Sequence, residues 1–261
     1  MRIVRFTPGP DAGLGQDPLF GVLEEDATIS IISGDPIYSG IQKTAAKIEL
    51  NKVRLLAPII PRSKVVCVGK NYADHAAEMG GVVPEEPIIF LKPNTSVIGP
   101  NDTIVWPDMS ERIDHEAELA IVIGRICKDV PLERVNDVIF GYTIANDVTA
   151  RDIQKKDGQW TRAKGFDTFC PIGPWVDTDF IPGTQKITAT IAGEVKQSAQ
   201  ISDMIFDVPT IVNFVSRVMT LLPGDIILTG TPAGIGPMVA GEKATMAIEG
   251  LGELTNKVSA K

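Results

Sequence analysis

Short runs of apolar residues, separated by Gly, Pro and polar residues, dominate the chain and predict a strand-rich fold. Residues 64–69 form one such run, of the kind that is buried inside a sheet. Turn signals bound further predicted strands. These are expected at residues 88–91, 116–123, 138–146, 186–191, 225–229 and 244–248.

Helical patterns are fewer and mostly short. Residues 71–79 are rich in alanine, with Asn71 available as an N-cap and a pair of glycines at the exit, which predicts a short helix. Residues 208–220 form the longest helical pattern, and residues 131–135 also have helical character. Together these elements predict a β-dominated, mixed α+β fold.

The first 60 residues predict a small accessory segment that is also β-rich. Polar and apolar positions alternate at residues 2–6 and 28–31, with Gly and Pro turn signals between them. We therefore expect an N-terminal segment at residues 1–60 and a larger catalytic domain at residues 61–261.

Composition narrows the classes of partner. Hydrophobic residues make up 44% of the chain and the net charge is −8, which argues against nucleic-acid binding because that needs a basic surface. No apolar stretch is long enough to span a membrane, and the N-terminus lacks the apolar core of a signal peptide. Three widely spaced cysteines without a CxxC motif indicate free thiols. We expect a cytoplasmic protein with no membrane partner.

Acidic residues at the start of one predicted strand form the most informative polar pattern. Alternate residues of a strand share a face, so Asp114, Glu116 and Glu118 are expected to point the same way. Carboxylates that enter an apolar core repel one another, and a bound cation removes that cost. Asp147, at the end of another strand, offers a third carboxylate. Oxygen ligands favour Mg²⁺ or Mn²⁺ over zinc; the alternative is an exposed edge strand with solvated acids.

Candidate acid–base groups lie on and after the predicted short helix. His75 and Glu78 are three residues apart, so their side chains are neighbours, and the carboxylate could make the imidazole a general base. Lys164 stands in a short stretch between an aromatic residue and a glycine, where it could stabilise an enolate or bind a carboxylate. The alternative for His75 and Glu78 is a pair on the surface of a helix, and the alternative for Lys164 is a solvated lysine.

Candidate substrate-binding groups are less specific. Arg151 and Gln154 follow Asp147 closely and could reach the same pocket. Residues 230–236 are rich in glycine but lack the ending of a phosphate-binding P-loop. They predict either a tight turn or a loop whose N–H groups, with the Thr231 hydroxyl, hold a substrate carboxylate.

Six stretches, in this order and spacing, resemble the fumarylacetoacetate hydrolase family across roughly residues 65–258. They are VGKNYADH at 68–75, FLKP at 90–93, HEAEL at 115–119, NDVTARD at 146–152, SDMIF at 202–206 and LPGDIILTGTP at 222–232. The resemblance implies the family's mixed β-sandwich roll, and members are usually homodimers. It matches the metal ligands to Glu116, Glu118 and Asp147. It matches the acid–base pair on a lid helix to His75 and Glu78, and the active-site lysine to Lys164.

Two further lysines in these stretches, Lys70 and Lys92, are expected to contact substrate; Lys70 stands where many relatives carry arginine. The resemblance implies Mg²⁺- or Mn²⁺-dependent cleavage of a carbon–carbon bond in a small keto acid. The reaction would be acylpyruvate or fumarylpyruvate hydrolysis, or oxaloacetate decarboxylation, through a pyruvate enolate. The alternatives are 2-hydroxyhepta-2,4-diene-1,7-dioate isomerisation, oxaloacetate keto–enol tautomerisation, and keto-acid binding without catalysis.

Overall fold

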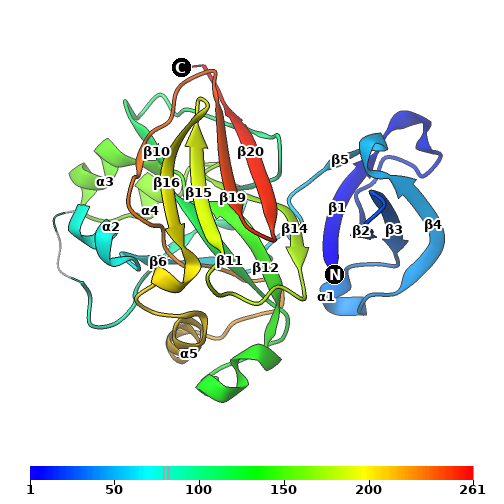
Figure 1. Cartoon of the computed structure of the whole chain (residues 1–261), viewed down its shortest axis with the longest axis horizontal. Coiled ribbons are helices and arrows are strands. Elements are labelled where there is room, and N and C mark those ends of the chain that lie inside the picture. Colours follow the sequence, from blue (N-terminus) through cyan, green and yellow to red (C-terminus); the bar gives the residue numbers. More distant parts are fainter. Residues whose placement is uncertain (79, 81–82, 261) are drawn as a thin grey trace.

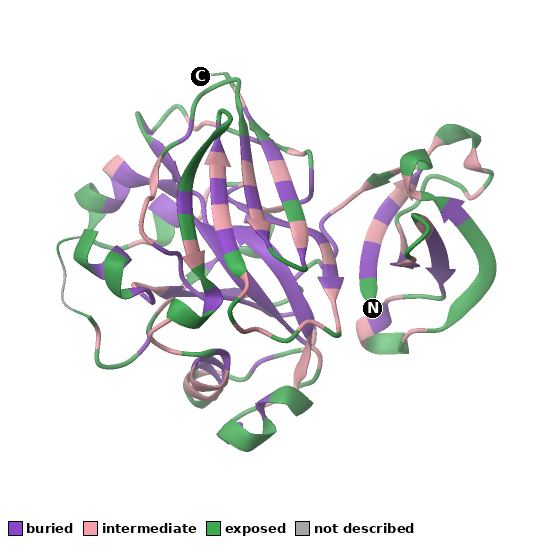
Figure 2. Cartoon of the chain, in the orientation of Figure 1, coloured by how far each residue is buried: buried purple, intermediate pink, exposed green. Residues whose placement is uncertain are grey.

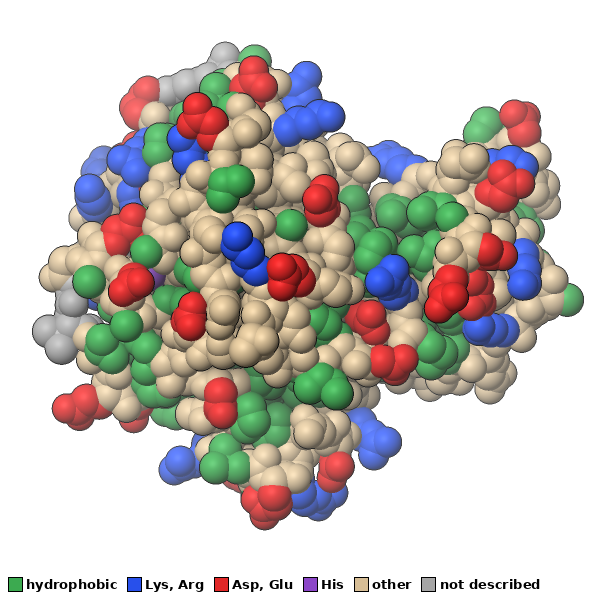
Figure 3. Space-filling view, viewed as in Figure 1, with side chains coloured by type: hydrophobic (Ala, Val, Ile, Leu, Met, Phe, Trp, Pro, Cys, Tyr) green, Lys and Arg blue, Asp and Glu red, His purple; other side chains and the backbone are tan. Residues whose placement is uncertain are grey.

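The computed structural model describes residues 1–78, 80 and 83–260. It shows a large strand-rich body and a small N-terminal module beside it (Figure 1). On the face drawn in Figure 3, acidic and basic side chains are interspersed, and hydrophobic side chains gather where the module meets the body. Within the described residues, no helix is both long enough and apolar enough to cross a lipid bilayer.

The larger sheet of the body carries the ends of the strands that matter for function. In spatial order its strands are β14 (Cys170–Asp177), β12 (Ile139–Asn146), β11 (Ala117–Ile123), β17 (Ile226–Leu228), β6 (Val65–Gly69) and β7 (Ile88–Lys92). Neighbours run antiparallel except β17 and β6, which are parallel; a short strand, β8 (Val97–Ile98), adds to β14 in parallel. Every residue of β11 is buried, which explains its continuous apolar run.

A second sheet packs on one face of the first. Its order is β16 (Glu194–Gln200), β15 (Lys186–Ile191), β19 (Lys243–Ile248), β20 (Gly252–Val258) and β9 (Thr103–Ile104). Contacts of β11 with β15, β12 with β19 and β14 with β20 close the sandwich, as Figure 1 shows. Buried side chains such as Leu119, Ile187 and Met246 fill the space between the sheets. In Figure 2, β11 and β12 are largely purple, whereas β15 and β19 alternate between purple and paler positions.

Short elements surround one end of the sandwich. A three-stranded sheet is made of β13 (Thr149–Ala150), β10 (Ile113–His115) and β18 (Gly236–Pro237). The helices of the body are α2 (Ala73–Glu78), α3 (Arg151–Asp157), α4 (Thr161–Lys164) and α5 (Val208–Val218). Single 3₁₀ turns occur at η3 (Asn94–Ser96) and η5 (Ile201–Asp203), and a longer 3₁₀ helix at η4 (Leu132–Asp137). Asp207 caps α5 by accepting the Thr210 N–H at 2.9 Å.

The N-terminal module is joined to the body through the larger sheet. Its strands are β1 (Arg2–Pro8), β2 (Leu19–Leu23), β3 (Thr28–Ile32), β4 (Lys43–Glu49) and β5 (Val53–Leu55), with short turns at η1 (Pro10–Ala12), α1 (Pro36–Ser39) and η2 (Leu50–Lys52). Strand β1 pairs with β14, where Ile3 lies opposite Val176. One sheet therefore runs from the module into the body.

The predicted β-dominated α+β fold is confirmed, and each predicted strand corresponds to an observed one within a residue or two. Residues 131–135, predicted to have helical character, lie at the start of the 3₁₀ helix η4, with Pro131 as its N-cap. The helix predicted at 71–79 spans only Ala73–Glu78; Met79 lies outside the described residues. Asn71 does not cap it, because its amide bonds Phe206 and the Thr229 carbonyl instead.

Candidate metal centre and active site

Three buried carboxylates converge where strands of the larger sheet end. Glu116 lies between β10 and β11, Glu118 lies in β11, and Asp147 directly follows β12. Since β11 and β12 are antiparallel neighbours, these positions meet at one edge. Each residue is at most 4% exposed, and one oxygen from each lies within 4.8 Å of the others. The structure thus brings together the three predicted metal ligands.

The electrostatics of Glu118 suit a bound cation. Its carboxylate accepts a hydrogen bond from the Gly230 N–H at 2.6 Å. Burial, together with the charges of Asp147 and Glu116, raises the pKa of Glu118 well above its ordinary value. A divalent cation bound to the three carboxylates would offset that cost, and an all-oxygen donor set suits Mg²⁺ or Mn²⁺.

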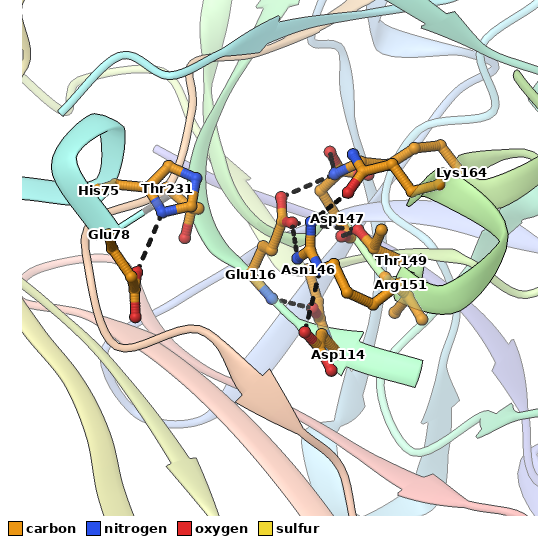
Figure 4. Close-up of polar contacts among 12 residues, drawn as sticks. His75, Glu78, Asp114, Glu116, Asn146, Asp147, Thr149, Arg151, Lys164 and Thr231 are labelled. Atoms are coloured by element: carbon orange, nitrogen blue, oxygen red, sulfur yellow. Dashed lines mark hydrogen bonds and ion pairs between the residues drawn. The ribbon is translucent and has the colours of Figure 1, made fainter. Parts of the chain in front are cut away.

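Lys164, at the end of α4, lies against the same carboxylates. Its buried ammonium donates to Glu116 Oε2 at 2.7 Å and to Asp147 Oδ2 at 2.6 Å (Figure 4). Burial opposes its charge, but Asp147 and Glu116 raise the pKa of Lys164 above its ordinary value. Burial would likewise raise the pKa of Glu116, yet Lys164 and Arg151 hold it well below its usual range. Lys164 is therefore a fixed cation at neutral pH.

Asp114 is linked to Glu116 through an arginine. It was predicted to share the face of the two glutamates, and its carboxylate accepts from Arg112 at 2.7 Å and from Arg151 Nε at 3.0 Å. Arg151 also donates to Glu116 Oε1 at 2.5 Å and to Gln154 Oε1 at 2.6 Å. Asp114 therefore orients the arginine that borders the metal centre and is not one of the three converging carboxylates.

Lys92, predicted as a substrate contact, lies against the carboxylate of Asp147. Its ammonium is buried and donates to Asp147 Oδ1 at 2.6 Å and to the Val148 carbonyl at 3.2 Å. It is not among the residues that line the cavity. The structure therefore assigns Lys92 to orienting Asp147.

His75, on α2, lines the same cavity, and Figure 4 shows Glu78 beside its imidazole. His75 Nδ1 lies 3.2 Å from Glu78 Oε2, which confirms that the two side chains are neighbours on a helix. The Glu78 carboxylate also accepts the Gly234 N–H at 3.2 Å. The glycine-rich loop at 230–236 thus holds the carboxylate that orients the imidazole.

A small cavity of about 30 Å³ joins these groups. Its polar lining is Lys70, His75, Glu116, Glu118, Asp147, Arg151, Gln154, Lys164 and Thr231. The volume suffices for about one water, so a keto acid can enter only if lining side chains or α2 move. Lys70, in the left-handed region at φ 57°, is the lining cation for which no ionic partner is described.

The apolar wall of the cavity was not predicted from the sequence. Trp160 packs edge-on to Phe90 at 5.1 Å and lies against the backbone of Gly69, where an added Cβ would stand 2.7 Å from the indole. Two polar supports were also missed. Asn146 accepts the Glu116 N–H at 3.0 Å, and the Thr149 hydroxyl donates to Glu116 Oε1 at 3.1 Å. Isolated Trp, Asn and Thr residues carry no pattern that marks them for such positions.

Family models cover nearly all of the chain. The model of the fumarylacetoacetate (FAA) hydrolase C-terminal domain matches residues 64–259, and one described as Rv2993c-like, N-terminal, matches residues 1–58. The chain belongs to the fumarylacetoacetate hydrolase family. Protein Rv2993c of Mycobacterium tuberculosis is 60% identical over 231 residues, covering 87% of this chain and 85% of that protein. Oxaloacetate tautomerase Fahd2a, mitochondrial, of Rattus norvegicus is 43% identical over 219 residues, covering 80% and 70%.

Solved structures of several enzymes share the whole architecture. The 5-carboxymethyl-2-hydroxymuconate delta-isomerase of Mycobacterium smegmatis is 48% identical, with a TM-score of 0.91 and complete coverage of both chains. Maleylpyruvate hydrolase of Sphingobium sp. SYK-6, solved with manganese(II) and pyruvate, is 32% identical, with a TM-score of 0.81 over 100% of this chain and 99% of that one. The relatives therefore include tautomerase, isomerase and hydrolase.

Proposed function

We propose that this protein is a divalent-metal-dependent enzyme that acts on small 2-keto acids by forming or consuming their enolate. The observation that carries the proposal is the convergence of three buried carboxylates in a cavity that is also lined by His75, the partner of Glu78. A cation held by Glu116, Glu118 and Asp147 would supply positive charge that stabilises an enolate. Lys164 and Arg151 add fixed positive charge that suits a substrate carboxylate.

His75 is the group we expect to move the proton. Its Nδ1 faces Glu78, which leaves Nε2 to take a proton from the carbon next to the keto group and to return it elsewhere. Glu78 holds the ring in place. Neither step needs a water molecule, so tautomerisation or double-bond isomerisation is the simplest reaction for these residues.

Keto–enol tautomerisation or double-bond isomerisation is therefore our first candidate. The relative named oxaloacetate tautomerase is 43% identical and the isomerase structure is 48% identical, against 32% for the maleylpyruvate hydrolase. These values support placing the isomerase and tautomerase alternatives ahead of the carbon–carbon cleavage that the sequence suggested first.

Cleavage of a carbon–carbon bond is the second candidate. It is supported by the maleylpyruvate hydrolase structure, which holds manganese(II) and pyruvate. In hydrolysis, His75 would deprotonate a water molecule that attacks the distal carbonyl. In oxaloacetate decarboxylation no attacking water is needed, so His75 would matter less.

The experiment is a set of parallel assays with Mg²⁺, with Mn²⁺ and with chelator. Enol absorbance follows oxaloacetate tautomerisation and dienedioate isomerisation, and coupled pyruvate detection follows cleavage of acetylpyruvate, fumarylpyruvate and oxaloacetate. We expect metal-dependent loss of enol without pyruvate. Pyruvate release would favour the second candidate, and no turnover of any substrate would refute the proposed function.

We also propose a homodimer, as the family resemblance implies. Strand β7 is an edge of the larger sheet and leaves Ile88 and Leu91 exposed, and exposed edge strands commonly pair or are covered. Light scattering on the protein as it elutes from a size-exclusion column should give a molar mass of twice the 28.1 kDa of one chain. A value equal to one chain would exclude the dimer.

A further inference from the structure

Strand β17 ends just before the metal centre and leaves the first residues of β11 without a strand neighbour on that side, although β12 pairs with them on the other. The last register pair joins Ala120 to Leu228. One residue further, Thr229 donates both its N–H and its hydroxyl to the Leu119 carbonyl, at 3.1 and 3.0 Å. Gly230 then turns the chain away at a φ of 96°, a conformation that favours glycine. The backbone groups of β11 beyond this point need other partners.

Ala117 is the residue that loses its neighbour, because continuing the register would place Thr231 opposite it. Side chains replace the missing strand. The Ala117 N–H donates to Gln197 Oε1 at 2.9 Å, and the Thr231 hydroxyl donates to the Ala117 carbonyl at 2.9 Å. Gln197 Nε2 in turn donates to the Thr231 hydroxyl at 2.8 Å and to the Pro232 carbonyl at 2.7 Å. One amide thus joins β11 to the loop that follows β17.

Gln197 reaches this position from the other sheet of the sandwich. It lies in edge strand β16, where its neighbours Lys196 and Ser198 are exposed while Gln197 itself is fully buried. Burying an amide is costly unless its polar atoms are paired, and here both the oxygen and the nitrogen are. The network made with Ala117 and Thr231 is therefore the gain that offsets this burial.

We propose that Gln197 is a positioning residue for the metal centre. Ala117 stands between Glu116 and Glu118, so fixing its peptide group fixes the backbone from which both carboxylates project. Through Thr231, the same amide holds a residue that lines the cavity. Gln197 touches neither the carboxylates nor the cavity and acts through these two residues.

Strand β16 supports the acid–base pair by a second route. An added Cβ on Gly234 would stand 2.2 Å from the Lys196 carbonyl, so the glycine-rich loop rests directly on the backbone beside Gln197. The Gly234 N–H donates to Glu78, which orients His75. One short stretch of an edge strand thus supports both the ligand backbone and the loop that holds Glu78.

The test is Mn²⁺ binding by calorimetry to the full chain and to Gln197→Met, whose side chain has similar length but no amide. We expect the dissociation constant to rise roughly 10- to 100-fold, the usual effect of losing a group that orients metal ligands. This proposal depends on the proposed function only in assuming the metal site, because the experiment measures Mn²⁺ binding and not turnover.

The matched control is Asn256→Leu. Asn256 is also a buried amide in the second sheet, in β20, and it bonds the carbonyls of Gly99 and Asp102 at 2.8 and 2.9 Å, not the metal centre. We expect it to lower the melting temperature of the metal-free protein about as much as Gln197→Met does and to leave Mn²⁺ binding unchanged. Loss of affinity in both variants would mean that Gln197 acts only through global stability, which overturns the proposal.

A second variant, Gln197→Glu, covers the case in which Gln197→Met does not fold. It keeps an acceptor for the Ala117 N–H but cannot donate to Thr231 and Pro232, so a smaller loss of Mn²⁺ affinity is expected. Unchanged affinity in whichever variant folds would overturn the proposal. Mn²⁺ binding by the unaltered chain without turnover would refute the proposed reaction alone, and no Mn²⁺ binding by it would overturn both.

Discussion

Of the three converging carboxylates, Glu118 is the one that contacts no lysine or arginine among the described residues. Glu116 and Asp147 each accept from lysine or arginine, whereas Glu118 accepts the backbone N–H of Gly230. Burial and the charges of Asp147 and Glu116 raise the pKa of Glu118. At the residue scale, Glu118 is therefore where a bound cation has most to offset.

Replacing Glu118 should change how the stability of the metal-free protein depends on pH. An acid whose pKa is raised by folding holds its proton more tightly in the folded state. Its contribution to the free energy of unfolding is therefore lost as the pH rises above the ordinary pKa of the group. The Glu118→Gln variant lacks this loss. We therefore measure the free energy of unfolding of both proteins by urea unfolding with chelator present. The free energy of unfolding of Glu118→Gln minus that of the unaltered chain should increase from pH 5 to pH 8. A difference that stays constant over this range would contradict the assignment.

Replacing His75 should remove proton transfer and spare the metal site. Loss of a general acid–base group costs about 10²- to 10⁴-fold in rate, so we expect a fall of that order in the turnover number of His75→Ala. The Mn²⁺ dissociation constant of this variant, measured by calorimetry, should stay within about threefold of the original, because the three side chains that would hold the ion do not include His75. Wild-type turnover in this variant would exclude His75 as the base.

At the scale of elements, the site depends on irregular segments placed between regular strands. The break at Glu116 separates β10 from β11, and the loop after β17 leaves the sheet at Gly230. Each irregularity re-aims a side chain or a backbone N–H toward the cavity, and each is held by side chains from other elements. The regular strands supply rigidity, while the interruptions supply the chemistry.

Gly234 offers a test of the loop that holds Glu78. Its φ of 94° and the close Lys196 carbonyl disfavour any side chain, so Gly234→Ala should cost roughly 1–3 kcal/mol of stability. Because the Gly234 N–H would shift away from Glu78, turnover should also fall while Mn²⁺ affinity is kept. Gly193→Ala, at a similar φ of 84° but with no atom near its Cβ, is the matched control and should keep full turnover.

At the scale of the molecule, the metal centre is built from segments far apart in the chain. The three carboxylates come from the break before β11, from β11 and from the residue after β12, the neighbouring cations come from β7, α3 and α4, and the His–Glu pair comes from α2. A cation bound there joins several segments of the folded chain and has no such site in the unfolded one. Metal binding should therefore stabilise the whole fold.

Removing the metal should lower the melting temperature. With free Mg²⁺ or Mn²⁺ at about 100 times its dissociation constant, binding adds about 2.7 kcal/mol, or roughly 5–10 °C for a chain of this size. Scanning calorimetry with metal and with chelator measures the shift. Glu116→Ala should show none, and an equal shift in that variant would place the stabilising ion elsewhere.

Local patterns in the sequence were sufficient to predict the strands of this protein and the side chains that are neighbours along one element. Apolar runs located the strands, and alternation along one of them placed Glu116 and Glu118 together. Helical spacing paired His75 with Glu78. These features follow from repeats of two residues in a strand and three to four in a helix, which neighbouring residues define without help from the rest of the fold.

Which distant groups meet depends on the tertiary fold. Alternation along the strand predicted the face on which Asp114 lies, but not that Arg112 and Arg151 form ion pairs with it. Nor did any local pattern predict that the Lys92 ammonium donates to Asp147. Gln197, in a strand whose neighbouring side chains are exposed, gave no signal of burial. The physical reason is that a side chain's partner depends on the register and packing between strands far apart in the chain, and no local periodicity records either.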